Sequence, residues 1–205
     1  MKQRPILFSG AMVNAILEDR KTQTRRIIKD QPQIDPATGD WLWINTDEMS
    51  RVRPLADFAD IKAAHCPYGK VGDHLWVRET WAKQLDGNII YRADFKDWEK
   101  ADYTATGHWK PSIFMPRDAC RIMLEITDVR VELLNDISEE DSIAEGVMKG
   151  REHYLDYIAF KHKTTQFVYQ CMNAKASYKS LWASINGHQS WEQNPFVWGI
   201  TFKRI

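Results

Sequence analysis

Alternating apolar and polar positions predict strands along much of the chain. The longest run covers 122–133, where Ile122, Leu124 and Ile126 share one face and the alternation changes phase near 127–128. A change of phase within one strand is typical of a β-bulge. Shorter runs, which alternate or concentrate β-branched and apolar residues, predict further strands at 5–8, 22–28, 41–44, 74–79, 89–92 and 196–205.

Apolar residues have the spacing of a helix in three segments. Over 10–19 they recur at i, i+3 and i+4, and Ser9 can cap the first turn. A second helix opens at Ser138, with an acidic residue three positions on, and Gly146 suits a left-handed cap at its end. The pattern from 151 to 186 is mostly helical. Its apolar face carries Tyr178, Leu181, Trp182 and Ile185.

Short strands, a few helices and a strand near each end of the chain predict an α+β fold. We expect the strands to close into a small barrel with the helices packed outside it, because closure leaves no exposed strand edges. The 205 residues suffice for a single domain over 1–205. We expect this domain to contain long insertions at about 30–65, which is rich in turn residues and lacks periodicity, and at about 84–120 and 148–180.

Composition narrows the possible function classes. Hydrophobic residues make up 43% of the chain, and Lys+Arg 28 balance Asp+Glu 28. A neutral chain does not suit a protein that coats nucleic acid non-specifically, although a local basic site is compatible with it. No apolar run reaches the ~18–20 residues of a membrane span, and the first residues turn polar too soon for a signal peptide. Since Cys66, Cys120 and Cys171 cannot all pair with one another, we expect reduced thiols in a cytoplasmic protein that does not bind membranes.

Common cofactor and metal motifs are missing from the sequence. C-x-x-C, H-x-x-x-H, G-x-G-x-x-G, the Walker loop and the nucleophile elbow do not occur. We therefore expect neither a metal nor a cofactor. The nine tryptophans exceed ordinary usage and have two interpretations, an aromatic core or stacking faces for nucleic-acid bases.

Residues 20–26 form the densest polar cluster, at the predicted junction between a helix and a strand. Four cations and two hydroxyls lie in these seven positions. Neighbouring arginines and partial burial would lower the pKa of Lys21, which could then act as a base or a nucleophile. The arginine guanidinium groups suit phosphate and carboxylate oxygens. A solvated basic turn is the alternative interpretation.

Glu145 stands at the predicted C-terminus of the second helix. The helix dipole disfavours a carboxylate at this end unless a cation faces it. One hypothesis therefore pairs Glu145 with Lys21. The other places Glu145 on the surface.

Four motifs resemble the ASCH family and follow one another in that family's order. Residues 16–25, ILEDRKTQTR, are similar to its I-L-x-G-x-K-T-x-T pattern, with Asp19 in place of glycine. Aspartate tolerates a left-handed turn better than most residues. Residues 71–77, 136–146 and 197–202 resemble the family's G-D-x-L-x-V strand, its L-T-x-E-x-A-x-x-E-G helix and its last strand. The resemblance implies a PUA-like β-barrel associated with RNA or modified nucleosides, and the long inserts resemble ASCH-like proteins of phages and prophages.

The resemblance also implies a candidate catalytic site. One small bacterial branch of the family is an amidohydrolase that removes the acetyl group from N4-acetylcytidine with a lysine, a threonine and a glutamate. By motif position these residues are Lys21, Thr24 and Glu145. Lys21 would activate the Thr24 hydroxyl or a water, Glu145 would orient or shuttle the proton, and nearby cations would stabilise the oxyanion.

Three functions stay open at this point. A binding module would hold RNA, or a modified nucleoside or nucleotide, in the cleft of the barrel. Arg20, Arg25 and Arg26 would then contact phosphate, and Trp76 would stack on a base. A hydrolase would cleave an acylated nucleoside at the site just described. A phage accessory protein would bind a host protein through the insertions.

Overall fold

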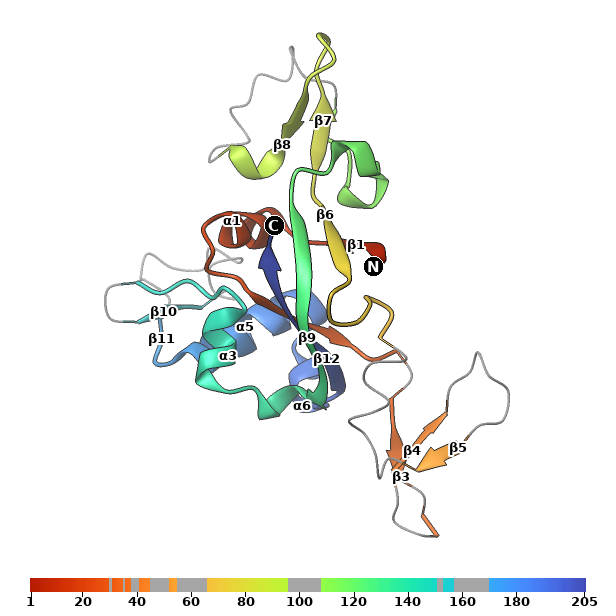
Figure 1. Cartoon of the computed structure of the whole chain (residues 1–205). Helices are drawn as coiled ribbons and strands as arrows, with labels where there is room; N and C mark the ends of the chain where they lie inside the picture. Colours follow the sequence, from red (N-terminus) through yellow and green to blue (C-terminus); the bar gives the residue numbers. More distant parts are fainter. Residues whose placement is uncertain are drawn as a thin grey trace.

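The centre of the molecule is a five-stranded mixed sheet (Figure 1). The computed structural model describes residues 1–29, 31–34, 36–37, 41–44, 52–54, 66–95, 108–150, 153–156 and 170–205. In spatial order the strands are β1 (Gln3–Leu7), β6 (His74–Arg78), β9 (Met123–Leu133), β12 (Phe196–Arg204) and β2 (Gln23–Ile27). Strand β1 runs parallel to β6, and the other neighbouring pairs are antiparallel.

These five strands lie where the alternation predicts them. The register between β9 and β12 shifts between Thr201 and Phe202, which pair with Asp128 and Ile126. Thr127 is therefore the additional residue of a bulge, which confirms the interpretation of the phase change. On the core side of the sheet, the alternating apolar residues pack against helix α1 (Gly10–Leu17), whose Val13 and Ile16 are buried.

The sheet does not close into the expected barrel. Within the described parts of the chain, no strand pairing joins the two edge strands β1 and β2. A side-chain bridge spans the opening instead: the Arg26 guanidinium of β2 donates to the carbonyl oxygen of Leu7 in β1 at 2.6 Å. The architecture is thus α+β with an open sheet, and the opening between β1 and β2 exposes the pocket described below.

Three helices cover the end of the sheet near the C-terminus of β9 (Figure 1). Helix α3 (Glu139–Ala144) begins where predicted, and the Ser138 hydroxyl accepts a hydrogen bond from the backbone N–H of Asp141 at 3.0 Å. Helices α5 (Ala174–Asn186) and α6 (Gln189–Glu192) pack beside it around a second hydrophobic cluster. Trp191 is buried in that cluster and Trp198 in the main core, which confirms the aromatic-core interpretation for these two rings. Trp182 is buried in the same cluster and also lines the pocket described below.

The segment 151–186, whose pattern is mostly helical, is only partly helical where the structure describes it. Its described part starts with β10 (Tyr154–Leu155), which pairs with β11 (Gln170–Cys171), and α5 begins only at Ala174. The Asn173 side chain accepts from the Ala176 backbone N–H at 2.8 Å and so caps the helix at this point. Strands of two residues are too short to show alternation, which explains why the pattern missed them. Residues 157–169 lie outside the described part.

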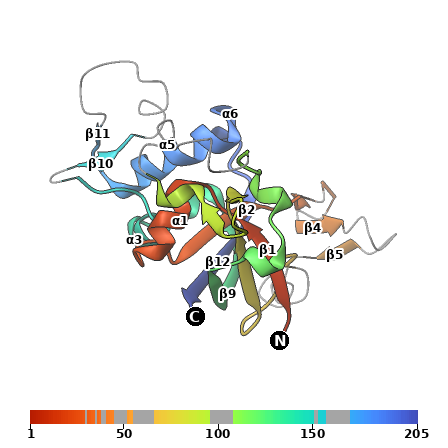
Figure 2. The same ribbon diagram turned by 90° about the horizontal axis from the view of Figure 1, so that it is seen from above.

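Two excursions extend from the central sheet, one at the top and one at the lower right of Figure 1, and Figure 2 shows the latter beside the sheet, at the right. One is the hairpin of β7 (Trp81–Lys83) and β8 (Ile89–Tyr91), followed by short 3₁₀ turns. The other is a three-stranded sheet of β3 (Gln33–Ile34), β4 (Trp41–Ile44) and β5 (Val52–Pro54), which confirms a strand at 41–44. Much of the expected insertions 30–65 and 148–180 lies outside the described residues, so a host-protein contact there stays a prediction. No described helix is both long and apolar enough to cross a membrane.

Candidate functional site

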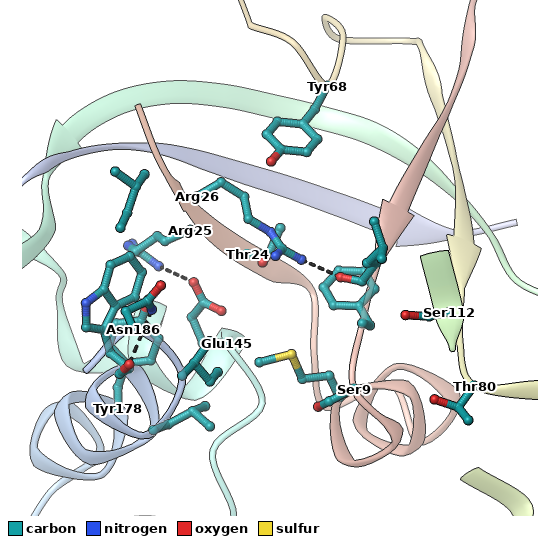
Figure 3. Close-up of a pocket in the computed structure, with 17 residues that line it drawn as sticks. Ser9, Thr24, Arg25, Arg26, Tyr68, Thr80, Ser112, Glu145, Tyr178 and Asn186 are labelled. Carbon is teal, nitrogen blue, oxygen red and sulfur yellow. Dashed lines mark hydrogen bonds and ion pairs between the residues drawn. The ribbon is translucent and has the colours of Figure 1, made fainter. Parts of the chain in front are cut away.

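A pocket of about 390 Å³ lies at the opening between the two edge strands (Figure 3). This volume falls within the ~300–1,000 Å³ range of small-molecule sites. The end of β1, the length of β2, the C-terminal cap of α3 and one face of α5 all contribute side chains. The principal lining residues are Leu7, Phe8, Met12, Thr24, Arg25, Arg26, Ile27, Glu145, Tyr178, Leu181, Trp182 and Ile185.

The structure brings Lys21 and Glu145 together beside this pocket. The Lys21 Nζ lies 2.6 Å from the Glu145 Oε2 and 2.8 Å from the Glu145 carbonyl oxygen. Both side chains are buried, at 0% and 3% exposure. Burial lowers the pKa of Lys21 from its usual 10.5, and the neighbouring Glu145 charge opposes this only in part. Glu145 lines the pocket directly, whereas Lys21 lies behind it.

Local backbone geometry explains how the two residues meet. After α1 the chain turns at Asp19, whose φ of 55° is left-handed, as expected for the residue in place of the family glycine. The next strand then runs along the end of α3, where the Thr22 N–H donates to the Ala144 carbonyl at 2.8 Å. Gly146 has a φ of 85°, and a Cβ there would lie 2.8 Å from the Lys21 Cβ. Only glycine allows this close approach.

Substitution of Gly146 by alanine tests this approach. We expect Gly146→Ala to lower the free energy of unfolding by about 1–3 kcal/mol more than a control alanine at another left-handed glycine, because its Cβ overpacks against Lys21. Gly72 is that control, since its φ is 83° and no atom lies within 4 Å of the position that a Cβ would take. Urea unfolding of both variants gives the difference. An equal loss of unfolding free energy in the two variants would contradict the close approach of Gly146 to Lys21.

Arg25 lines the pocket, and its guanidinium group forms ion pairs with three carboxylates. Its Nη1 lies 3.3 Å from Glu145 Oε1, its Nη2 2.8 Å from Asp141 Oδ2 and its Nε 2.7 Å from Glu132 Oε1. The side chain is fully buried. The sequence-based hypothesis assigned Arg25 to phosphate; in the structure its three guanidinium nitrogens contact these carboxylates. Arg25 orients one oxygen of Glu145 (Figure 3). Lys21 holds the other oxygen.

A second arginine, outside the pocket lining, contacts two of the carboxylates that pair with Arg25 and stabilises this arrangement. Arg130 contacts both Glu132 and Asp141 and so links the two carboxylates that hold Arg25. Partial burial opposes ionisation of Asp141, but a hydrogen bond from Gln23 and the charges of Arg130 and Arg25 keep its pKa below the usual 3.8. Asp141 therefore stays ionised and keeps Arg25 in place.

Thr24 and Tyr178 complete the polar part of the pocket. Thr24 is almost fully buried, at 3% exposure, and follows Lys21 on the same segment. Tyr178 of α5 is a site residue that sequence analysis assigned only to an apolar helix face. Burial raises its pKa well above 10, and the negative charge of Glu145, with which its hydroxyl hydrogen-bonds, raises it further. A tyrosine within a buried apolar stripe was the one available signal.

Arg26 is the cation that faces the pocket without a carboxylate partner among the described residues. Its guanidinium carbon lies 5.3 Å from the Phe8 ring centroid, and its Nε is buried without a hydrogen-bond partner there. The bond to Leu7 occupies Nη2 only. Arg26 thus keeps donor capacity at the mouth of the opening between β1 and β2.

Two predicted binding residues lie elsewhere. Trp76 does not line this pocket; its ring lies against the guanidinium groups of Arg78 and Arg117, at 5.2 and 5.9 Å. The alternation of β6 buries Leu75 and therefore places Trp76 on the other face of the sheet. Arg20 pairs with Glu18 and lines an adjoining cavity instead. The described residues contain no group of His, Cys, Asp and Glu that could hold a metal ion.

Comparison with known proteins gives one structural likeness. No family model matches the chain, and no curated protein matches it. Among solved structures, the chain is similar to one from Lactobacillus crispatus JV V101, with 12% identity, a TM-score of 0.38 and coverage of 99% of this chain and 79% of the other. That structure is an ASCH domain. At this degree of similarity we base the function on the pocket of this chain alone.

Proposed function

We propose that the pocket binds a nucleoside or nucleotide with a modified pyrimidine base, free or within RNA. The observation that supports this most directly is the placement of a buried carboxylate, Glu145, and a cation without a carboxylate partner among the described residues, Arg26, in one cavity of nucleoside size. A pyrimidine base offers N–H donors at its edge, which a carboxylate accepts. A phosphate offers the charge that a guanidinium binds.

Apolar walls supply the remaining contacts for such a ligand. Phe8 lies on the β1 side of the pocket, and Leu181 and Trp182 of α5 lie on the other. Flat apolar surfaces bind either face of a base by stacking and dispersion, whereas the edge is read by hydrogen bonds. In this arrangement Glu145 accepts hydrogen bonds from the edge of the base, and Arg26 binds the phosphate.

The proposal is tested with a panel of nucleosides, nucleotides and modified oligonucleotides by titration calorimetry. We expect Arg26→Gln to weaken nucleotide binding about tenfold and to flatten its salt dependence, with a smaller effect on the nucleoside that lacks phosphate. Arg117→Gln serves as the matched control, since Arg117 is exposed and lies against Trp76. Equal affinities of wild type and Arg26→Gln for nucleotides would contradict the role of Arg26.

Hydrolysis of an acylated nucleoside is a second candidate, because Lys21 has a lowered pKa and contacts a carboxylate that lines the pocket. In that reaction Lys21 takes a proton from the Thr24 hydroxyl or a water, and the oxygen attacks the acyl carbon. Glu145 receives this proton from Lys21, whose Nζ lies 2.6 Å from its Oε2, and relays it to the leaving exocyclic nitrogen, so that the amide C–N bond breaks. Water supplies the atoms that convert the amide into a free acid and an amine. Release of acetate from N4-acetylcytidine tests the reaction directly.

A further inference from the structure

A second cavity of about 280 Å³ adjoins the pocket, and Glu145 lines both. The two cavities share five lining residues: Ser9, Met12, Glu145, Leu181 and Ile185. Residues that line only the second cavity come from α1, α5 and the turn after α3, and include Ala11, Ala15, Met148 and Ser184. The second cavity therefore adjoins the candidate site, shares part of its lining and has its own walls.

The chemistry of the two cavities differs. The first gathers Thr24, Arg25, Arg26 and Tyr178. In the second, aliphatic and thioether side chains form most of the lining, and Arg20 directs its guanidinium to Glu18 and to the Gly146 carbonyl oxygen. A group that enters the second cavity thus gains from burial of apolar surface and finds few polar partners.

Glu145 stands at the boundary between the two cavities, because it lines both. A base whose edge meets this carboxylate directs any substituent on that edge toward the second cavity. We propose that the second cavity binds an apolar substituent, an alkyl or aryl group, attached to the exocyclic nitrogen of the base held in the first. This inference rests on the proposed nucleoside binding and narrows it to one class of modification.

Cytidines with amine-linked substituents test this inference, since they contain no amide that could be hydrolysed. The probes are cytidine, N4-methylcytidine and N4-benzylcytidine, each titrated against the full chain by calorimetry. We expect the benzyl compound to bind about tenfold tighter than the methyl compound, because its ring is buried in the second cavity.

Two variants that fill the second cavity should abolish this preference. Ser184→Trp and Ala11→Trp change residues that line only the second cavity, and Ala11 is exposed on α1, which keeps at least one variant free of core disturbance. Ser112→Trp is the matched control because Ser112 lines only the first cavity. We expect the benzyl-to-methyl affinity ratio to fall to about one in the first two variants and to persist in the control, whatever the overall affinity.

The outcomes separate the inference from the function on which it rests. If cytidine and N4-methylcytidine bind but N4-benzylcytidine binds no tighter, or if both filling variants keep the preference, the second cavity is not a substituent site and nucleoside binding stands. If none of the three compounds binds, nucleoside binding in the first cavity is wrong, and the inference fails with it.

Discussion

Replacement of Arg25 by methionine is expected to lower the free energy of unfolding by about 3–5 kcal/mol. The Arg25 guanidinium is fully buried and lies within ion-pair distance of Glu132, Asp141 and Glu145. Its removal leaves three carboxylates directed at an apolar side chain, and Glu145 is too buried for water to replace the lost partner. Urea unfolding near pH 7 measures the loss.

Arg130→Met is the matched control for this prediction. Arg130 shares Glu132 and Asp141 with Arg25 but is 24% exposed, so its removal is expected to cost only about 1 kcal/mol. The deficit of the Arg25 variant should also shrink in acid. The stability that Asp141 contributes is present above its usual pKa of 3.8 and is lost as the pH falls through its lowered pKa. Equal losses for the two arginine variants would show that Arg25 is not the centre of the network.

For the hydrolysis proposed as the second candidate function, Lys21→Met is expected to reduce acetate release from N4-acetylcytidine by about 10²–10⁴-fold, the usual contribution of a positioned proton acceptor. The fold should survive, because Glu145 keeps its contact with Arg25 and because methionine fills much of the space of lysine. Circular dichroism and the melting temperature check the fold. Lys110→Met, which removes a lysine that lies over the Trp81 ring, is the control for loss of a cation.

The pH dependence of the hydrolysis rate gives a second test of the role of Lys21. The wild-type rate should rise as the pH approaches the lowered pKa of Lys21 from below, since only the neutral amine accepts a proton. The same shift affects stability: the folded chain releases this proton more readily than the unfolded chain, so the free energy of unfolding increases with pH between the lowered pKa and 10.5. Lys21→Met should lack that increase. A wild-type stability curve parallel to that of the variant would contradict the lowered pKa.

Local features of the fold could be predicted because neighbouring residues encode them. Alternation located the central strands and the bulge at Thr127, and the Ser138 cap marked the start of α3. Asp19 takes the left-handed conformation expected of it, and Gly146 has a positive φ at the end of that helix. The open edge of the sheet could not be predicted, because each edge strand has the same alternation whether or not it is paired.

In the candidate site, too, some features could be predicted from the sequence and others could not. Sequence reasoning selected Lys21, Thr24, Glu145 and the surrounding arginines, and it anticipated a lowered pKa for Lys21. It assigned phosphate binding equally to Arg25 and Arg26, although the structure buries one among carboxylates and leaves the other beside the pocket. It placed Trp76 in the site and missed Tyr178, because spacing alone does not show which face of a strand or helix borders the pocket.

By itself, the sequence determined the strands of the central sheet, where α3 begins and ends, and which short segment concentrates the reactive side chains. Those properties depend on residues only a few positions apart. Only the tertiary structure decided that Lys21 contacts a carboxylate 124 positions away, that Arg25 is ion-paired with carboxylates and that Arg26 lies at the opening between β1 and β2. Such contacts depend on how the packed core orders distant segments, and the energy of a buried charge depends on that packing rather than on its neighbours in sequence.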